Sequence, residues 1–227
     1  MSLYTKDHLL ENKIIYFQPR NGYRSGIEPI ILAAQANHEH KSILDLGSGC
    51  GPISLILAYR LPNSKIIGLE NNKLHLELSL KSKLENNLYN VEFKNEDVCI
   101  FNEKYLNYFD LVLSNPPFFF ENQIIKSKNE SINNAKYISK EKSEKWFQNL
   151  ILYLNDNGRA LIINRFENVE FMLQIFRLYN LLVEITPILS FKDTKPKNVL
   201  LSLKKNEKYV EKTKNEIIIH SNSSKYS

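Results

Sequence analysis

Three glycines at alternate positions, Gly47, Gly49 and Gly51, have a spacing that could shape a ligand site. They fall in the segment LDLGSGCGP, residues 44–52. The apolar stretch that contains Asp45 comes directly before the first glycine. Glycine lets the backbone turn tightly and lets a ligand approach without a Cβ atom in the way. Because a strand-like stretch precedes the loop and a helix-like stretch follows it, the loop predicts a ligand site at the carboxyl edge of a sheet.

The glycine spacing and two nearby acids distinguish between two classes of cofactor. A dinucleotide-binding loop has its third glycine one residue later, where this chain has Pro52, and it rests a pyrophosphate on the following helix. A carboxylate at Asp45 would repel that pyrophosphate, but it suits a cofactor that carries an ammonium and a sulfonium. Glu70 ends the next expected strand, 19 residues after Gly51, where its carboxylate can accept hydrogen bonds from both hydroxyls of a ribose.

The Gly-x-Gly-x-Gly loop with an acid two residues before it resembles motif I of the class I S-adenosylmethionine-dependent methyltransferases. This resemblance implies S-adenosylmethionine as the cofactor. It also implies that Asp97, which follows the third expected strand, lies near the adenine amino group of that cofactor. The expected cofactor contacts, including an asparagine discussed next, are Asp45, Gly47, Gly49, Gly51, Glu70, Asn71, Asp97, Val98 and Asn115.

The segment SNPPFFF follows the fourth expected strand, and its Asn-Pro-Pro-Phe core resembles motif IV of methyltransferases that act on a planar amide or exocyclic amine nitrogen. Such a nitrogen is a poor nucleophile, because its lone pair is delocalised. The resemblance implies that the carbonyls of Asn115 and Pro116 each accept one N–H and hold the nitrogen in line with the methyl group. Pro117 is expected to stiffen the loop. The resemblance also implies that Phe118 and Phe119 contact the extruded base, on which Phe118 stacks.

With the segment FQPRNGYRSGIEPIILAA at residues 17–34, both motifs resemble the bacterial tRNA adenine-N6 methyltransferases that modify adenosine 37 beside the anticodon of a valine tRNA. The resemblance runs over nearly the whole chain and implies a tRNA substrate. It places Tyr23 and Arg24 in a lid over the cofactor, as substrate contacts. One departure follows the aromatic run, where Ile132 and Lys136 replace the two arginines of the family's Arg-x-x-Ala-Arg.

Basic residues are concentrated in the C-terminal part of the chain. From residue 192 onward there are nine lysines and four acidic residues, an excess equal to the whole net charge of +5. Such a stretch favours an anionic partner such as nucleic acid. Lys195 and Lys197 lie in KPKNVLL, which resembles the family's basic entry into its last strand, and Lys136 lies in a further lysine-bearing segment. We expect these three lysines to contact RNA; a solvated, lysine-rich surface is the alternative.

Three other functions are compatible with parts of this pattern. Glutamine methyltransferases of translation release factors share an Asn-Pro-Pro-aromatic motif, but they usually carry an N-terminal helical domain and a tyrosine where this chain has Phe118. A DNA adenine methyltransferase needs a target-recognition domain, for which no segment is long enough. A non-catalytic RNA-binding protein of the same fold would not need Asp45, Glu70 and Asn115 together.

The elements that must position these motifs alternate between strands and helices. Strands are expected at residues 42–46, 65–70, 91–95, 110–114 and 159–164, and helices at 52–61, 72–87, 140–154 and 169–179. This alternation predicts an α/β fold with a mostly parallel sheet and helices on both faces. Residues 181–189 and 199–203 can pair as an antiparallel hairpin at one edge, and the family resemblance implies a Rossmann-like sheet of seven strands.

The expected organisation is an N-terminal lid segment at residues 1–40, a methyltransferase domain at 41–205 and a basic extension at 206–227, in which 216–220 could add a short strand. The 227 residues, 43% hydrophobic and 24% charged, suit one soluble domain. Two cysteines without paired spacing exclude a disulfide framework, and the five histidines show no metal-ligand spacing. Without a signal-peptide core or an apolar run of roughly 18 residues, we expect a cytoplasmic protein off the membrane, most simply a monomer without a metal.

Overall fold

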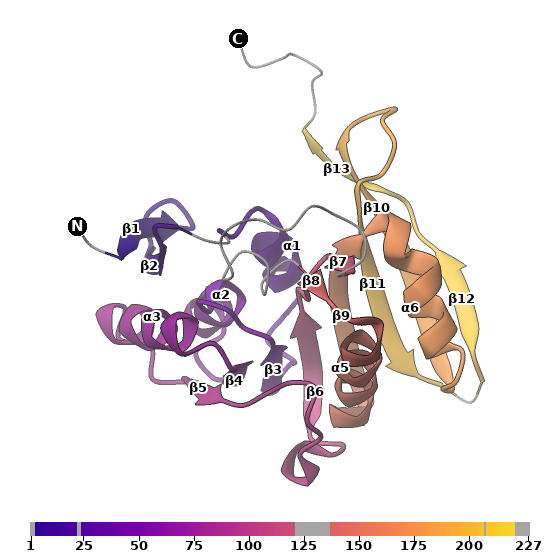
Figure 1. Ribbon diagram of the computed structural model, residues 1–227, viewed down its shortest axis with the longest axis horizontal. Coiled ribbons are helices and arrows are strands. Elements are labelled where there is room, and N and C mark those ends of the chain that lie inside the picture. The colour runs from indigo at the N-terminus through magenta and orange to yellow at the C-terminus, as the bar shows by residue number, and fades with distance from the viewer. Residues whose placement is uncertain (1–2, 22–23, 121–136, 207, 221–227) are drawn as a thin grey trace.

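A central β-sheet runs through the protein, with helices on both of its faces (Figure 1). The computed structural model describes residues 3–21, 24–120, 137–206 and 208–220. The strands are β1 (Tyr4–Leu9), β2 (Ile14–Pro19), β3 (Ser42–Leu46), β4 (Lys65–Glu70), β5 (Val91–Asn95), β6 (Phe109–Ser114), β7 (Phe119–Phe120), β8 (Tyr137–Ile138), β9 (Leu154–Arg165), β10 (Leu181–Phe191), β11 (Asn198–Lys205), β12 (Val210–Thr213) and β13 (Ile217–His220). The helices are α1 (Glu28–Ala34), α2 (Pro52–Arg60), α3 (Lys73–Glu85), α5 (Lys140–Tyr153) and α6 (Val169–Phe176), with short 3-10 helices η1 (Glu103–Tyr105) and η2 (Phe166–Asn168).

The direction of the strands brings the expected motifs to one edge of the sheet. The strand order is β12-β10-β11-β9-β6-β3-β4-β5, and β13 also pairs with β10. Neighbouring strands from β9 to β5 are parallel, whereas β11 is antiparallel to both β9 and β10. Strands β3, β4, β5, β6, β9 and β10 therefore all end at the same edge, called the carboxyl edge below.

The predicted fold class is confirmed, with one difference in the number of strands. The sheet is mostly parallel, and β10 and β11 form the predicted antiparallel hairpin. Instead of seven strands, it contains nine within the described residues. The additional strands are β12 and β13, which lie parallel to β10, and β13 covers most of the possible strand at 216–220. Strand β12 carries a weak sequence signal because an edge strand of mostly exposed residues shows little apolar alternation.

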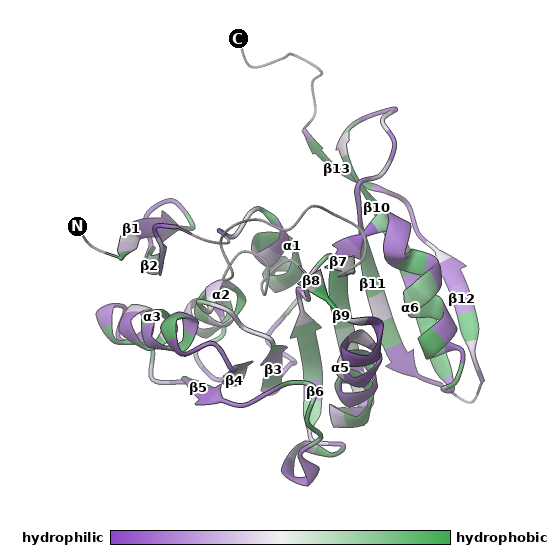
Figure 2. Ribbon diagram, in the orientation of Figure 1, coloured by the Kyte–Doolittle hydropathy of each residue, from purple (hydrophilic) through white to green (hydrophobic). Residues whose placement is uncertain are grey.

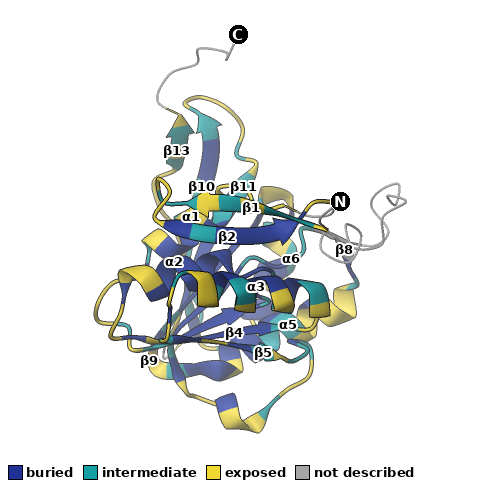
Figure 3. Ribbon diagram, turned by 90° about the vertical axis from the view of Figure 1, so that its left-hand side faces the viewer, coloured by how far each residue is buried: buried dark blue, intermediate teal, exposed yellow. Residues whose placement is uncertain are grey.

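Adjacent residues of β3 point to opposite faces of the sheet and belong to two hydrophobic cores. Ile43 packs in the core that contains residues of α1, α2 and α3, whereas Leu44 packs with α5 and α6. The central strands β3 and β6 are accordingly hydrophobic (Figure 2) and mostly buried, while the helices expose their outer sides (Figure 3). Burying one such side chain contributes about 1.5–3 kcal/mol, so both cores hold the strand ends at the carboxyl edge in fixed positions.

Helix starts near the carboxyl edge are fixed by local signals. Helix α2 begins with Pro52 in its first turn, as predicted. The Asn72 side chain caps α3 by accepting a hydrogen bond from the His75 N–H at 3.2 Å. The Ser139 hydroxyl caps α5 by accepting one from the Lys142 N–H, also at 3.2 Å. These caps place His75 and Lys142 in the first turn of their helices.

The antiparallel hairpin of β1 and β2 is not expected from the sequence. Its turn contains Leu10, Glu11 and Asn12 at positive φ angles of 49°, 53° and 68°, without the glycine that usually signals such a turn. The hairpin packs on α3 (Figure 3), and the Phe17 N–H donates a hydrogen bond to the Ser82 hydroxyl at 3.0 Å. The N-terminal segment is thereby fixed to a helix that begins at the carboxyl edge.

Candidate functional site

The glycine loop between β3 and α2 adopts a conformation that requires its glycines. Gly47, Gly49 and Gly51 have positive φ angles of 78°, 56° and 83°, which residues with a side chain rarely adopt. A Cβ atom at Gly51 would lie 2.6 Å from the Phe93 ring, whereas a Cβ atom at Gly49 would meet nothing within 4 Å among the described residues. Packing therefore demands the glycine at position 51, and Gly49 borders open space.

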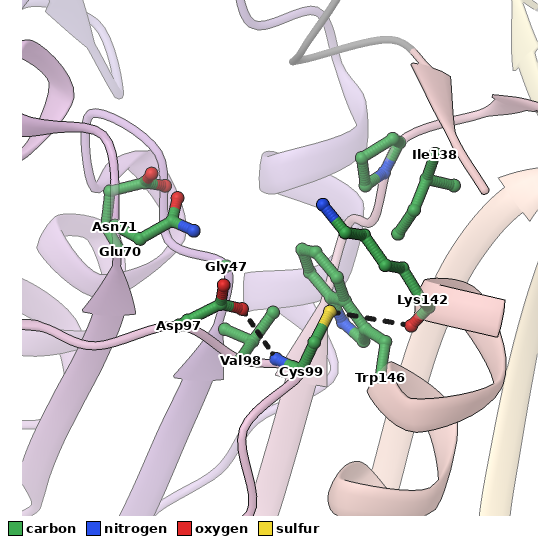
Figure 4. Close-up of a pocket in the computed structure, with 10 residues that line it drawn as sticks. Gly47, Glu70, Asn71, Asp97, Val98, Cys99, Ile138, Lys142 and Trp146 are labelled. Carbon is green, nitrogen blue, oxygen red and sulfur yellow. Dashed lines mark hydrogen bonds between the residues drawn. The ribbon is translucent and has the colours of Figure 1, made fainter. Parts of the chain in front are cut away.

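A cavity of about 270 Å³ opens at the carboxyl edge beside the glycine loop (Figure 4). Its lining residues come from the loops after β3, β4, β5 and β6, from β8 and from α5: Gly47, Glu70, Asn71, Asp97, Val98, Cys99, Pro117, Ile138, Lys142 and Trp146. The structure thus brings together six residues that the motifs single out. It adds four that they do not, namely Cys99, Ile138, Lys142 and Trp146.

Two backbone amides hold the Glu70 carboxylate in the wall of this larger cavity. The Gly49 N–H donates to Oε2 at 2.8 Å, and the Asn72 N–H donates to Oε1 at 2.7 Å. Figure 4 shows Glu70 and Asn71 together on one side of the cavity, opposite the Trp146 ring. A fixed carboxylate retains further acceptor capacity, so this side suits a ligand with hydroxyl donors.

Asp97 and Cys99 form another part of the lining, close to α5 (Figure 4). The Cys99 N–H donates to the Asp97 carboxylate at 2.9 Å, and the Cys99 thiol donates to the Lys142 carbonyl at 3.5 Å. Burial, with the nearby charge of Asp97, raises the pKa of the Cys99 thiol to about 11. The thiol is therefore protonated at neutral pH, and it offers the cavity a weakly polar surface rather than a charge.

The single tryptophan of the chain packs against the glycine loop. A Cβ atom at Gly47 would collide with the Trp146 ring. The Trp146 indole N–H donates to the Ser114 hydroxyl at 3.0 Å, and that hydroxyl donates to the Leu46 carbonyl at 2.7 Å. This chain of hydrogen bonds ties α5 to the ends of β3 and β6. From sequence, a tryptophan on an amphipathic helix is typical of core packing and carries no signal for a ligand site.

A smaller cavity of about 50 Å³ also borders the glycine loop. Its lining residues come from the N-terminal segment, the glycine loop, α2, α3 and the end of β6: Tyr16, Ser25, Pro29, Gly47, Ser48, Gly49, Cys50, Pro52, Ile53, His75 and Asn115. The Asn115 Oδ1 atom is buried, and no described residue donates a hydrogen bond to it. Asn115 therefore holds an available acceptor at the carboxyl edge, next to the glycine loop.

The Asn-Pro-Pro-Phe loop is anchored beyond its start at the end of β6. Pro116 is buried, and Pro117 and Phe118 are half-buried. The Asn168 side-chain amide donates to the Phe118 carbonyl at 2.7 Å and to the Asn164 side-chain oxygen at 2.7 Å. Since these asparagines lie in η2 and β9, the rest of the sheet fixes the loop that carries the four predicted catalytic residues.

Asp45 lies beneath the glycine loop and lines neither of these two cavities. One oxygen of its fully buried carboxyl group accepts hydrogen bonds from the Ser54 N–H at 3.2 Å and the Ser54 hydroxyl at 2.7 Å. The other oxygen has no partner within the described part of the chain. Burial raises the pKa of Asp45 to about 7; the Ser54 hydrogen bonds oppose this shift and the charge of Glu70 adds to it. Its contact with the cofactor stays a prediction.

The predicted substrate contacts have different settings. Tyr23 and Lys136 lie outside the described residues. The backbone of Phe119 opens β7, which pairs with β8. Lys195 and Lys197 are exposed in the segment between β10 and β11, and this segment begins at the carboxyl edge. The two lysines therefore lie on the same side of the molecule as the cavities.

Arg24 is engaged with the N-terminal hairpin. Its guanidinium donates to the Asp7 carboxylate at 3.0 Å and to the Thr5 hydroxyl at 2.8 Å. The Gln18 amide donates to the same Asp7 oxygen at 3.0 Å. In this structure Arg24 links the hairpin to the segment that leads into α1, and its contact with a substrate stays a prediction.

The described part of the chain contains no helix that is long and apolar enough to cross a membrane. Within the same residues, no group of three or more His, Cys, Asp and Glu side chains is placed to hold a metal ion. Both cysteines are free; Cys50 is buried and Cys99 is half-buried.

The family model of the methyltransferase small domain matches residues 29–178, which is more than half of the chain. The chain belongs to this family. The tRNA1(Val) (adenine(37)-N6)-methyltransferase of Histophilus somni is 26% identical over 214 residues, which cover 92% of this chain and 88% of that protein. A release factor glutamine methyltransferase of Fusobacterium nucleatum is 34% identical over 85 residues, which cover 37% of this chain and 24% of that protein. Among solved structures, a predicted O-methyltransferase from Agrobacterium tumefaciens has a TM-score of 0.69 at 19% identity, covering 86% of this chain and 89% of that one.

The predicted family resemblance is thereby confirmed, and the methyltransferase uses S-adenosylmethionine as its cofactor. The residues at the carboxyl edge fit this cofactor. The glycine loop leaves open space at Gly49, where a ligand can lie against the backbone. The Glu70 carboxylate is fixed in a cavity wall where ribose hydroxyls can donate to it.

Proposed function

We propose that this methyltransferase transfers a methyl group to the N6 nitrogen of adenosine in tRNA, at adenosine 37 of a valine tRNA. The observation that carries the proposal is the Asn115 Oδ1 atom, a buried acceptor that no described residue uses, at the start of a proline-stiffened loop. An exocyclic amine has two N–H donors. The Asn115 side chain accepts one of them, and the adjacent Pro116 carbonyl accepts the other.

These two acceptors activate and orient the nitrogen. S-adenosylmethionine supplies a methyl group on a positively charged sulfur. With both N–H bonds held in the plane of the carbonyls, the nitrogen lone pair turns away from the ring and faces that methyl carbon. When bound, the cofactor would supply the methyl group to this nitrogen, and the electron pair of the broken C–S bond would remain on its sulfur. The Asn115 and Pro116 carbonyls stabilise the positive charge that develops on the nitrogen, and its proton is then lost to water.

Other residues of the two cavities hold the reactants. Glu70 binds the ribose hydroxyls, and Asp97, with Asn71 and Val98, contacts the adenine of the cofactor. Phe118 stacks on the base that carries the reacting amine. Its carbonyl is held by Asn168, which fixes the direction in which the loop continues from the reacting centre.

A tRNA substrate is supported by the extent of the sequence similarity and by surface charge. Similarity to the Histophilus somni tRNA methyltransferase covers 92% of this chain, whereas similarity to the release factor enzyme covers 37%. The segment that carries the exposed Lys195 and Lys197 begins at the same edge as the cavities, where these lysines can contact phosphates. The expected cytoplasmic location agrees with such a substrate.

The proposal is tested by offering tritiated S-adenosylmethionine with unmodified tRNA in one reaction and with purified release factor in another. We expect label in tRNA that elutes as N6-methyladenosine after nuclease digestion. Label confined to the release factor would reverse the assignment to glutamine chemistry. Unmodified tRNA in which adenosine 37 is replaced by guanosine is the matched control, and it should take up no label.

A further inference from the structure

The start of α5 carries three lysines, although this is an unfavourable position for positive charge. Lys140 and Lys142 lie in the first turn of the helix, and Lys145 lies in the next turn. The N-terminus of a helix has a partial positive charge of its own, so cations are disfavoured there. A sequence that breaks such a local preference indicates a functional site when the cation has no structural partner.

Two of these lysines have a partner within the protein. The Lys145 ammonium forms an ion pair with the Glu141 carboxylate at 2.8 Å. The Lys140 ammonium lies over the Phe171 ring, 5.8 Å from its centre. Lys142 differs from both, because its ammonium makes no ion pair, hydrogen bond or ring contact within the described part of the chain. Of the three, Lys142 is therefore the one available to a ligand.

The backbone of Lys142 is fixed, and its side chain reaches the larger cavity. The Lys142 N–H donates to the Ser139 hydroxyl at 3.2 Å, and the Lys142 carbonyl accepts a hydrogen bond from the Cys99 thiol at 3.5 Å. The side chain extends from α5 into the cavity, with the ammonium at the end farthest from the helix (Figure 4). Pro117 lines the same cavity, so Lys142 shares this space with the Asn-Pro-Pro-Phe loop.

An anion is the natural partner of this ammonium, and the nucleoside part of the cofactor carries none. The carboxylate of the cofactor belongs to its amino-acid end, which lies on the far side of the ribose from the adenine. Lys142 lies at the adenine side, because its carbonyl contacts Cys99, two residues after the expected adenine contact Asp97. A nucleic-acid substrate, in contrast, carries a phosphate on each side of the reacting adenosine.

We propose that Lys142 binds a phosphate that adjoins the reacting adenosine of the RNA. The contact holds the target nucleotide while its base lies against the Asn-Pro-Pro-Phe loop, so Lys142 binds substrate and takes no part in the transfer itself. Loss of the ammonium therefore raises the KM for tRNA and leaves kcat unchanged. The inference rests on the proposed function, because a release factor would bring no phosphate to this position.

Three substitutions on α5 test this contact, with unmodified valine tRNA as the substrate. Lys142→Met removes the charge but keeps a long side chain, and we expect it to raise the KM for tRNA roughly tenfold, the effect of one lost hydrogen bond between charged groups. Its kcat and the Kd of S-adenosylhomocysteine should change less than about twofold. Lys142→Arg retains the charge and should recover most of the loss. Lys145→Met is the matched control, and it should leave all three quantities unchanged.

An uncharged linkage in the RNA identifies the phosphate. Two further tRNAs each carry a single methylphosphonate, one on the 5′ side and the other on the 3′ side of adenosine 37. One of them should raise the KM of the wild type roughly tenfold. The same tRNA should raise the KM of Lys142→Met less than about twofold, because this variant has already lost the contact.

The possible failures of this inference and of the proposed function can be told apart. An unchanged KM in Lys142→Met, or equal losses from each methylphosphonate in the wild type and in this variant, would overturn the inference while tRNA still takes up label. Weaker binding of S-adenosylhomocysteine but not of 5′-methylthioadenosine by Lys142→Met would overturn it too, since Lys142 would then pair with the carboxylate of the cofactor. A wild type that transfers no label to any tRNA would contradict the proposed function, and the inference with it.

Discussion

The glycine loop and the Asn-Pro-Pro-Phe loop follow adjacent strands, β3 and β6, but they treat their polar groups differently. In the glycine loop, the Ser48 N–H donates to the Leu69 carbonyl at 2.8 Å and the Gly49 N–H donates to Glu70 at 2.8 Å. In the other loop, Asn115 Oδ1 is buried and receives no hydrogen bond from any described residue. The glycine loop pairs these two backbone donors within the protein, although its Ser48 hydroxyl is unpaired among the described residues, and the other loop keeps a side-chain acceptor available.

This difference corresponds to two tasks at one site. A loop that shapes a binding surface gains stability when its backbone groups are paired before the ligand arrives. A group that acts on a nucleophile accelerates the reaction only through contacts that are stronger in the transition state, so a free acceptor is useful there even though it costs about 1–3 kcal/mol in the folded protein. Substitutions in the first loop should therefore affect folding and cofactor binding, and substitutions in the second should affect turnover.

Removal of the free acceptor is the strongest test of this division. We expect Asn115→Ala to lower kcat on the order of 10²–10³-fold, the usual cost of losing one group that stabilises the transition state. The Kd of S-adenosylhomocysteine should change less than about threefold, because Glu70 and the glycine loop supply most of the contacts with the cofactor. Single-turnover methyl transfer and calorimetry measure the two quantities. Asn115→Asp keeps an oxygen acceptor in place and should recover part of the rate, and unchanged kcat in Asn115→Ala would remove Asn115 from the mechanism.

Glycines within the first loop can be compared with each other. Gly51→Ala combines a positive φ with a Cβ atom 2.6 Å from the Phe93 ring, and we expect it to lower the free energy of unfolding by about 3 kcal/mol. Gly49→Ala has the positive φ without the clash, so its loss should be about 1–2 kcal/mol. Urea unfolding measures both. Equal losses would mean that the backbone angle alone, and not packing against Phe93, requires the glycine at position 51.

Much of the fold follows from the sequence because the parallel strands are buried on both faces. Apolar runs bounded by polar residues predict β3 and β4 with the bounds that the structure has, and the alternating segment VEFKN predicts β5 with its bounds. The β1–β2 hairpin does not follow, because its turn places Leu10 and Glu11 at positive φ, which these residue types do not signal, and it has no glycine beside Asn12. The sequence does not predict strand β12 either, for another reason. Its residues are mostly exposed, so they show no apolar pattern, and the strand forms by pairing with the backbone of β10.

The candidate site also contains residues that the sequence predicts and residues that it does not. The glycine loop, Glu70 and the Asn-Pro-Pro-Phe loop follow strand ends, so local spacing is enough to predict that they meet at one edge. His75, Lys142 and Trp146 reach the cavities from α3 and α5. Their positions depend on how these helices pack against the sheet, and no short motif contains that information.

The pH dependence of the free energy of unfolding tests the protonation state of Asp45, which precedes the glycine loop. Its carboxyl group keeps its proton up to about pH 7 in the folded protein, but only below its ordinary value of 3.8 when unfolded. Between these values the folded state binds more protons, so this group makes the free protein less stable as pH rises from about 4 to about 7. We expect Asp45→Asn to remove that decline, as measured by urea unfolding across this pH range. Parallel curves for the variant and the wild type would show that Asp45 is ionised throughout.

The smallest expected effect lies outside both loops, on the surface that would receive the RNA. Replacing both Lys195 and Lys197 by alanine should weaken tRNA binding less than tenfold and make the slope of log Kd against log salt shallower by about 1–2, because each phosphate contact contributes about 0.7–0.9 to the slope. Lys41 and Lys65, exposed at the amino ends of β3 and β4, form the matched double variant, which should leave the slope unchanged. Fluorescence anisotropy over a salt series measures both. An unchanged slope in the first variant would mean that the RNA reaches Asn115 without crossing the β10–β11 segment. The surface that binds RNA would then have to be sought elsewhere around the two cavities.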